Sequence, residues 1–239
     1  MSAAACSSQF DLGALLRGEV DTIAAWIDGW TIGRTVSQVI VMIAGAGAFG
    51  AAMGCWRDPW QALYSGVKLP LILLLTAGGN SLINGMLAPL LGLNISLRQS
   101  FAAVLMSFAI AAAVLGAFSP LMLFLVWSLP PLEPGAEITP MVHAVMLLTL
   151  VGVIAFAGVT ANARLFQLLR RLGGSAATAW RLLFAWLAIN LMLGSQLSWN
   201  LRPFIGSPGL PVQFFRPDPF DGNFFQTIWR ITLRLLQAD

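Results

Sequence analysis

Charged side chains are scarce in this sequence. Asp, Glu, Lys and Arg make up 10% of its 239 residues, whereas hydrophobic residues make up 58%. A soluble domain carries about 25% charged and 45–50% apolar residues, so the composition excludes a water-soluble globule. It also excludes a disordered chain, because disordered segments are poor in apolar residues. The sequence therefore predicts an all-α protein, a bundle of helices that crosses a membrane several times.

Residues that carry out chemistry are equally few. The chain has two cysteines, Cys6 and Cys55, and one histidine, His143. Two cysteines so far apart imply neither a disulfide framework nor a metal site. No Asp or Glu falls within a predicted span, and acid–base or metal catalysis depends on such groups. We expect no enzymatic activity, no metal and no cofactor, and a net charge of +3 is too small to indicate nucleic-acid binding.

Long apolar runs divide the chain into spans. A helix that crosses the hydrocarbon core needs about 20 mostly apolar residues, and five segments satisfy this requirement: about 35–55, 69–91, 98–129, 139–161 and 180–199. The third is too long for one crossing and too short for two, so we expect a kink or break at Pro120. The fourth is expected to continue as helix to Arg171. Residues 35–200 are thus predicted to form the five-span bundle.

Amphipathic segments are predicted on both sides of this bundle, at 1–34 and within 201–239. In the first, apolar residues recur at steps of three and four, namely Leu12, Leu15, Leu16, Val20, Ile23, Ile27 and Trp30. In the second, Phe224, Phe225, Ile228, Thr232 and Leu235 share one face. Both patterns fit helices that lie in the headgroup layer, and docking on another subunit fits the same periodicity.

The distribution of basic residues predicts the orientation. With five spans, the side of the N-terminus carries seven arginines, and the other side carries six basic residues, Lys68 among them, half of which lie in the tail. Basic residues in short loops favour the cytoplasm. We expect a multi-pass protein of the bacterial inner membrane with a cytoplasmic N-terminus.

The second predicted span has a polar centre that contains Gly78, Gly79, Asn80 and Asn84. Small residues and Asn can cement helix packing, whereas an unwound, glycine-rich segment can line a solute path. Asn190 and Gln196 of the fifth span are candidates to pair with this segment.

A stripe of small residues runs along the first predicted span. Ala46, Gly50 and Gly54 follow one another at steps of four, a pattern typical of close helix–helix contact. Packing within the bundle and homodimerisation both fit it.

The tail departs most from an ordinary membrane bundle. It contains five prolines, Pro203, Pro208, Pro211, Pro217 and Pro219, interleaved with aromatic residues. Proline is excluded from helix interiors, and flexible linkers lack aromatic residues. We therefore expect an ordered, non-helical cap over the outer face. Its candidate contacts with a partner or a lipid headgroup are Arg202, Phe204, Phe214, Phe215 and Arg216.

Parts of the sequence resemble the YIP-type five-span membrane proteins, in particular their bacterial members. The resemblance covers roughly residues 55–200. It rests on the stretch from Leu90 to Phe101, where a glycine-containing loop precedes a helix start, and on Arg57-Asp58-Pro59-Trp60. The Asp-Leu-Tyr and Gly-Tyr signatures of the eukaryotic members are missing, so a GTPase-binding role does not carry over. The resemblance implies a non-enzymatic bundle that serves membrane organisation or assembly.

The sequence leaves two main functions open. The first is a non-catalytic scaffold or accessory subunit, with membrane lipids and other subunits or a second copy as partners. The alternative is a channel or transporter for a small solute that uses the Gly/Asn-rich second span. An intramembrane enzyme comes third, because the spans lack acidic residues.

Overall fold

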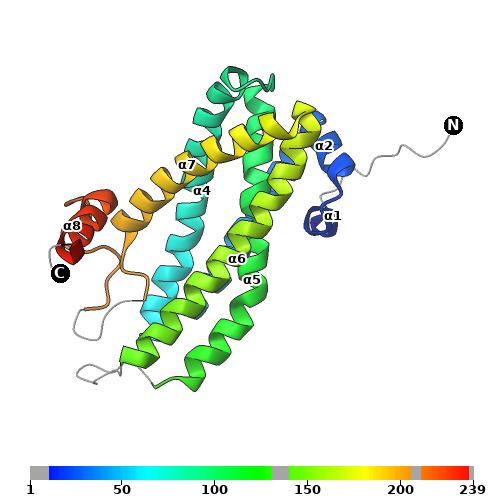
Figure 1. Ribbon diagram of the computed structural model, residues 1–239. Helices are drawn as coiled ribbons and strands as arrows, with labels where there is room; N and C mark the ends of the chain where they lie inside the picture. The colour runs from blue at the N-terminus through cyan, green and yellow to red at the C-terminus, as the bar shows by residue number, and fades with distance from the viewer. Residues whose placement is uncertain (1–10, 131–139, 206–210, 237–239) are drawn as a thin grey trace.

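The prediction of an all-α protein with five membrane-spanning helices is confirmed. A computed structural model describes residues 11–130, 140–205 and 211–236. Five of its helices are long and apolar enough to cross a membrane. They are α3 (Ile32–Gly54), α4 (Pro59–Leu90), α5 (Leu97–Ser128), α6 (Pro140–Gly173) and α7 (Ala176–Leu201). They run up and down in chain order (Figure 1).

Side-chain caps start several of these helices. Thr31, Ser96 and Ser175 each accept a hydrogen bond from a backbone N–H of the first turn, and Gln99 completes a capping box with Ser96. Such caps satisfy N–H groups that a helix leaves without a partner. The chain therefore encodes the helix starts locally, before any packing is considered.

Of the kink or break expected at Pro120, the break is wrong, because α5 is continuous from Leu97 to Ser128. Pro120 lacks the N–H that would bond to the carbonyl of Gly116. The hydroxyl of Ser119 donates to that same oxygen at 2.8 Å. A serine side chain thus replaces the missing donor, which is a known way to tolerate proline in a membrane helix.

Helix α4 begins ten residues earlier than the span predicted from hydropathy. Asp58 caps it by accepting from the backbone N–H of Trp60 at 2.7 Å, and Pro59 occupies the first turn, where proline is favoured. The extra turns contain Lys68, which is fully buried. The placement of Lys68 outside the spans was therefore wrong.

Helix α5 forms the centre of the bundle. Every residue from 102 to 110 is buried, and α3, α4 and α6 all pack against this helix. Close approach to α3 depends on glycine, since a Cβ atom on Gly116 would lie 2.8 Å from the Cα atom of Gly45.

The amphipathic N-terminal segment folds onto the bundle. Gly18, with a φ angle of 73°, separates α1 (Leu12–Arg17) from α2 (Val20–Asp28). Leu15, Ile23 and Trp26 are buried in the same cluster as residues of α5 and α6. Arg171 of α6 pairs with Asp21 at 3.1 Å. Helices of the same chain therefore cover the apolar face that periodicity assigned to the headgroup layer.

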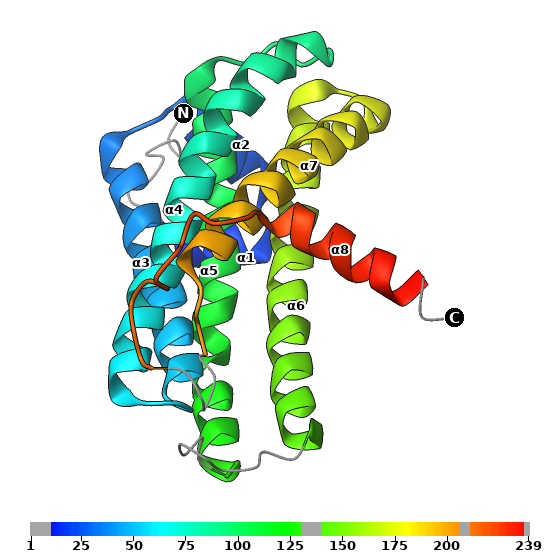
Figure 2. The same ribbon diagram turned by 90° about the vertical axis from the view of Figure 1, so that its left-hand side faces the viewer.

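The described part of the tail is ordered and non-helical before α8, as expected, and it lies along α4. Helix α7 is strongly inclined and ends at mid-height of the bundle, and the chain then descends along α4 (Figure 2). It returns to α8 (Phe224–Leu236), which stands beside the end of α7 in both views (Figures 1 and 2). We call the end of the bundle where α4 begins the tail end.

Candidate functional site: a cavity between α4, α5, α6 and α7

A cavity of about 300 Å³ lies between four of the spanning helices. Its walls are mostly apolar and include Leu73 of α4, Ala111 of α5 and Ala157 of α6. Five uncharged polar residues also line it: Thr76, Ser107, Asn162, Asn190 and Ser198. None of its lining residues is charged. The cavity therefore suits a small uncharged molecule that can form hydrogen bonds.

A smaller polar pocket adjoins this cavity. It measures about 10 Å³ and is lined by residues that include Asn80 and Trp186. Ser107, Asn162 and Asn190 line both spaces. The structure thus brings Asn80 and Asn190, predicted from separate spans, to one polar pocket at the cavity's edge.

Two buried polar groups around these spaces lack a hydrogen-bond partner among the described residues. They are the hydroxyl of Thr76 in the cavity and the indole N–H of Trp186 in the small pocket. An unsatisfied buried group costs about 1–3 kcal/mol. Both groups are therefore available to a solute or to water within the bundle.

The Asn pair of α4 is buried and internally bonded. Asn80 and Asn84 are 3% and 0% exposed, and the amide nitrogen of Asn84 donates to the side-chain oxygen of Asn80 at 2.7 Å. Helix α4 is unbroken through this segment, so the interpretation as an unwound segment is wrong. A Cβ atom at Gly79 would lie 3.1 Å from Leu193 of α7, whereas one at Gly78 would meet nothing within 4 Å.

These residues belong to a buried polar face along α4. Its members are spaced three or four residues apart, or a multiple of that, and so lie on one side of the helix: Gln61, Ser65, Lys68, Thr76, Asn80 and Asn84. The first three were not among the residues predicted from the sequence. Their spacing would have revealed them had Asp58-Pro59 been taken as the helix start.

At the tail end, this face holds the tail. Lys68 donates to the carbonyl oxygen of Pro203 at 2.8 Å. Gln61 donates to the carbonyl oxygens of Pro203 at 3.1 Å and of Phe204 at 2.7 Å, and Ser65 donates to that of Phe204. Irregular backbone is tolerated at membrane depth only where its polar groups are satisfied. Gln61, Ser65 and Lys68 meet this requirement for two successive carbonyls.

The tail aromatics surround the same lysine. The ammonium group of Lys68 lies 4.9 Å from the ring centroid of Phe214 and 5.9 Å from that of Phe204. Phe214 packs edge-on against Tyr64, with ring centroids 5.5 Å apart, and Phe215 packs against Phe214. These contacts favour the cation through the ring faces and fix the tail to α4.

The two tail arginines differ in their surroundings. Arg202 follows the last residue of α7 and lies over the ring of Trp199, whereas Arg216 is exposed. Burial, and then the charge of Arg216, lower the pKa of the Arg202 guanidinium. Two of its nitrogens, Nε and Nη1, are buried without a hydrogen-bond partner in the described part of the chain.

Gln196 does not join the cavity. Its amide nitrogen donates to Asn200 at 3.0 Å, and its side-chain oxygen accepts from the backbone N–H of Phe224 at 3.2 Å. It also lines an open groove between α7 and α8. Gln196 therefore attaches the start of α8 to α7.

The small-residue stripe of α3 is used inside the bundle. A Cβ atom at Gly50 would collide with the backbone carbonyl of Ser65, and one at Gly54 would lie 2.5 Å from that of Gln61. Ala46 is fully buried. The contact with α4 occupies Gly50 and Gly54, which leaves these two positions unavailable for a homodimer.

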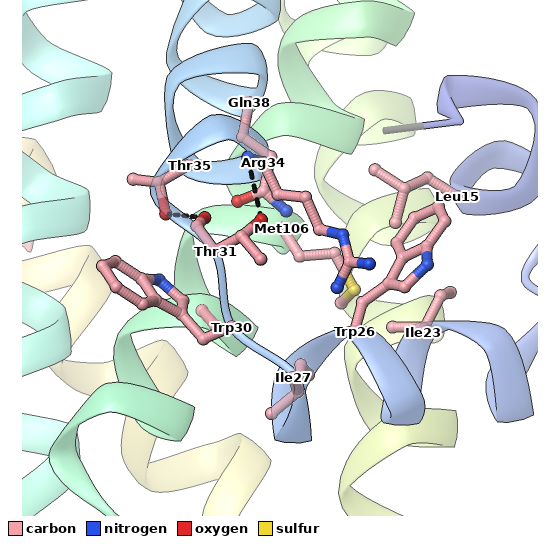
Figure 3. A pocket seen from close by; sticks show the side chains of 11 residues that line it. Leu15, Ile23, Trp26, Ile27, Trp30, Thr31, Arg34, Thr35, Gln38 and Met106 are labelled. Carbon is pink, nitrogen blue, oxygen red and sulfur yellow. Dashed lines mark hydrogen bonds between the residues drawn. The ribbon is translucent and has the colours of Figure 1, made fainter. Parts of the chain in front are cut away.

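Another small pocket lies where α2 meets α3, and it has the size of one water molecule. It measures about 20 Å³, and a water needs roughly 10–15 Å³. Figure 3 shows Arg34 reaching toward Trp26 across this pocket, and Arg34 donates to the carbonyl of Gly29 at 2.9 Å. A cation at the C-terminal end of α2 stabilises that helix, so Arg34 attaches α2 to α3 at this pocket.

Within the described residues, no group of three or more His, Cys, Asp or Glu side chains could hold a metal ion. The side chain of His143 lies outside the described part.

No protein-family model, no curated protein and no solved structure matches the chain. The resemblance to YIP-type proteins stays a prediction from short motifs.

Proposed function

We propose that this protein is a membrane channel or transporter that admits a small uncharged solute to the cavity between α4, α5, α6 and α7. The hydroxyl of Thr76 carries the proposal, because it is buried, lines the cavity and has no partner among the described residues. Asn162, Asn190 and Ser107 supply further donors and acceptors. The absence of charge from the lining favours a neutral solute over an ion.

The small pocket supports the same function. It extends the cavity toward Asn80 and the indole N–H of Trp186, so a solute could exchange hydrogen bonds along α4. The proposal includes no catalytic step. We place the protein in a bacterial inner membrane with its N-terminus in the cytoplasm, as the arginine distribution favours.

Glycerol flux tests the proposal. Purified protein is reconstituted into liposomes, and glycerol entry is followed by stopped-flow light scattering. We expect faster entry than into protein-free liposomes, and Asn190→Leu should remove most of the gain. Asn94→Leu is the matched control, because Asn94 lies in the exposed turn between α4 and α5. Entry at the protein-free rate, or equal loss in both variants, would contradict the proposal.

A role as scaffold or accessory subunit is the second candidate. Its supporting observation is α8, which packs against α7 alone among the described helices and leaves Trp229 64% exposed. Exposed apolar patches often mark interaction surfaces. Under this candidate, truncation after Asn223 should release a partner subunit or split a dimer in mild detergent, while glycerol entry stays at the protein-free rate.

A further inference from the structure

Non-helical chain lies next to the tail end of the cavity. Phe204 and Ile205 pack against a buried cluster that includes Leu115 of α5 and Ala157 of α6. Leu115 and Ala157 also line the cavity, together with Leu69 of α4. Helix α7 ends at mid-height (Figure 2), and residues 203–205 follow beyond its end, where Pro203 and Phe204 are bonded to α4 within about one turn of the cavity residue Leu69.

The groups that hold residues 203–205 are unusual for a permanent contact. Lys68 is fully buried, and no carboxylate pairs with it among the described residues. A charge at membrane depth is costly, and apolar residues of similar volume often give equal or greater stability than buried ionic groups. A purely structural clamp would not need a lysine at this position.

The same groups would serve an open cavity. Gln61, Ser65 and Lys68 lie on the face of α4 that continues to Thr76 and Asn80. If residues 203–205 left their position, water could take over the hydrogen bonds that the two carbonyls now accept. The polar face would then be open to water from the tail end as far as Lys68, with Ile72 between it and Thr76 of the cavity.

We propose that residues 203–205 form a plug, and that Gln61, Ser65 and Lys68 form a latch that holds the plug shut or releases it to let solute in. This inference rests on the proposed function, since it assigns the regulation of the same cavity. The latch holds backbone carbonyls by side-chain hydrogen bonds, so the plug leaves without unfolding any of the five spanning helices.

Thiol labelling in nanodiscs tests the plug directly. Both bilayer faces meet the buffer there, so no orientation has to be assumed. Cys6 and Cys55 are replaced by Ser, Thr76→Cys is introduced in the cavity, and labelling by a charged, water-soluble methanethiosulfonate is timed. Lys68→Met should raise the labelling rate about tenfold, as expected from loss of a charge-assisted hydrogen bond. Val67→Met is the matched control, because Val67 is exposed on the outer side of the same turn, and its rate should not change.

A second variant and a second thiol separate opening from unfolding. Phe204→Ala shrinks the plug and leaves α4 intact, and it should also speed labelling of Thr76→Cys. Ala109→Cys, fully buried on α5, should stay unlabelled in both variants. Unchanged labelling of Thr76→Cys in both variants would overturn the plug, and so would labelling of both thiols together, which would show a structural clamp.

Failure of the plug is distinguishable from failure of the proposed function. Faster labelling without any glycerol flux would keep the plug and reject passage of solute. Glycerol flux with unchanged labelling would keep passage and reject the plug.

Discussion

The ammonium group of Lys68 donates a hydrogen bond to the carbonyl oxygen of Pro203 across 2.8 Å, although the two residues lie 135 positions apart in the chain. Lysine and proline are both unfavourable at membrane depth, for reasons of charge and of backbone. Here the irregular backbone at Pro203 offers the ammonium group of Lys68 a hydrogen-bond acceptor. The lysine in turn satisfies a carbonyl oxygen that has no partner within a helix. Two unusual features of the sequence thus belong to one contact.

Replacing Gln61 with Leu should loosen the tail. Gln61 donates to both tail carbonyls, and loss of a buried partner costs about 1–3 kcal/mol. Chymotrypsin should then cut faster after Phe204 and Phe215 in the folded protein, whereas trypsin is no probe here because Arg202 and Arg216 both precede proline. Gln226→Leu, on exposed α8, is the control and should leave the cutting rate unchanged. Equal rates in wild type and Gln61→Leu would show that these hydrogen bonds do not hold the tail.

Alanine at Gly50 should destabilise the bundle, whereas alanine at Gly78 should not. A Cβ atom at Gly50 collides with α4, but one at Gly78 meets nothing within 4 Å. Overpacking costs about 1–3 kcal/mol, and Gly→Ala in an open helical position can add up to about 1 kcal/mol. Thermal unfolding in detergent measures both. The packing account fails if the two variants shift the midpoint equally.

Asn84 and Asn190 should separate stability from function. Asn84 bonds only within α4, to Asn80, and does not line the cavity, whereas Asn190 does. Asn84→Leu should lower stability by about 0.6–2 kcal/mol and keep glycerol flux. Asn190→Leu should lose flux at unchanged stability. If Asn84→Leu lost flux and Asn190→Leu kept it, the solute path would run past Asn84 and not through the cavity.

The N-terminal helices should depend on Leu15. This residue is 0% exposed, whereas its neighbour Leu16 is 39% exposed. Leu15→Asp would bury an unpaired charge, a change that typically costs several kcal/mol, so α1 and α2 should detach from α5 and α6. Proteolysis at Arg17 should then accelerate, whereas Leu16→Asp should have little effect. Resistance of both variants would show that α1 and α2 are held by other contacts.

Helix number was predictable because span length and caps are local properties of the sequence. The start of α4 was missed because hydropathy counts apolar residues, whereas Asp58 and Pro59 begin the helix among polar ones. The sequence did not exclude a break at Pro120, because the role of Ser119 depends on a bond within the helix. Amphipathic periodicity indicated that α1 and α2 bury one face, but it carries no information on which surface covers that face.

The candidate site was predictable only in part. Asn80 and Asn190 were identified as polar residues within apolar spans, and they do line one pocket. Ser107 and Asn162 were not identified, because a single hydroxyl or amide in a span has no distinguishing pattern. Lys68 was hidden by the same hydropathy boundary that displaced the start of α4.

Filling the cavity tests the central claim most directly. Ala111 of α5 lines the cavity, so the larger side chain of Ala111→Phe should fill it. Glycerol entry should then fall to the rate of protein-free liposomes, and thermal stability should be unchanged or higher. Ala117→Phe on the exposed side of the same helix should retain full entry. Full glycerol entry through folded Ala111→Phe would contradict the claim that solute passes through this cavity.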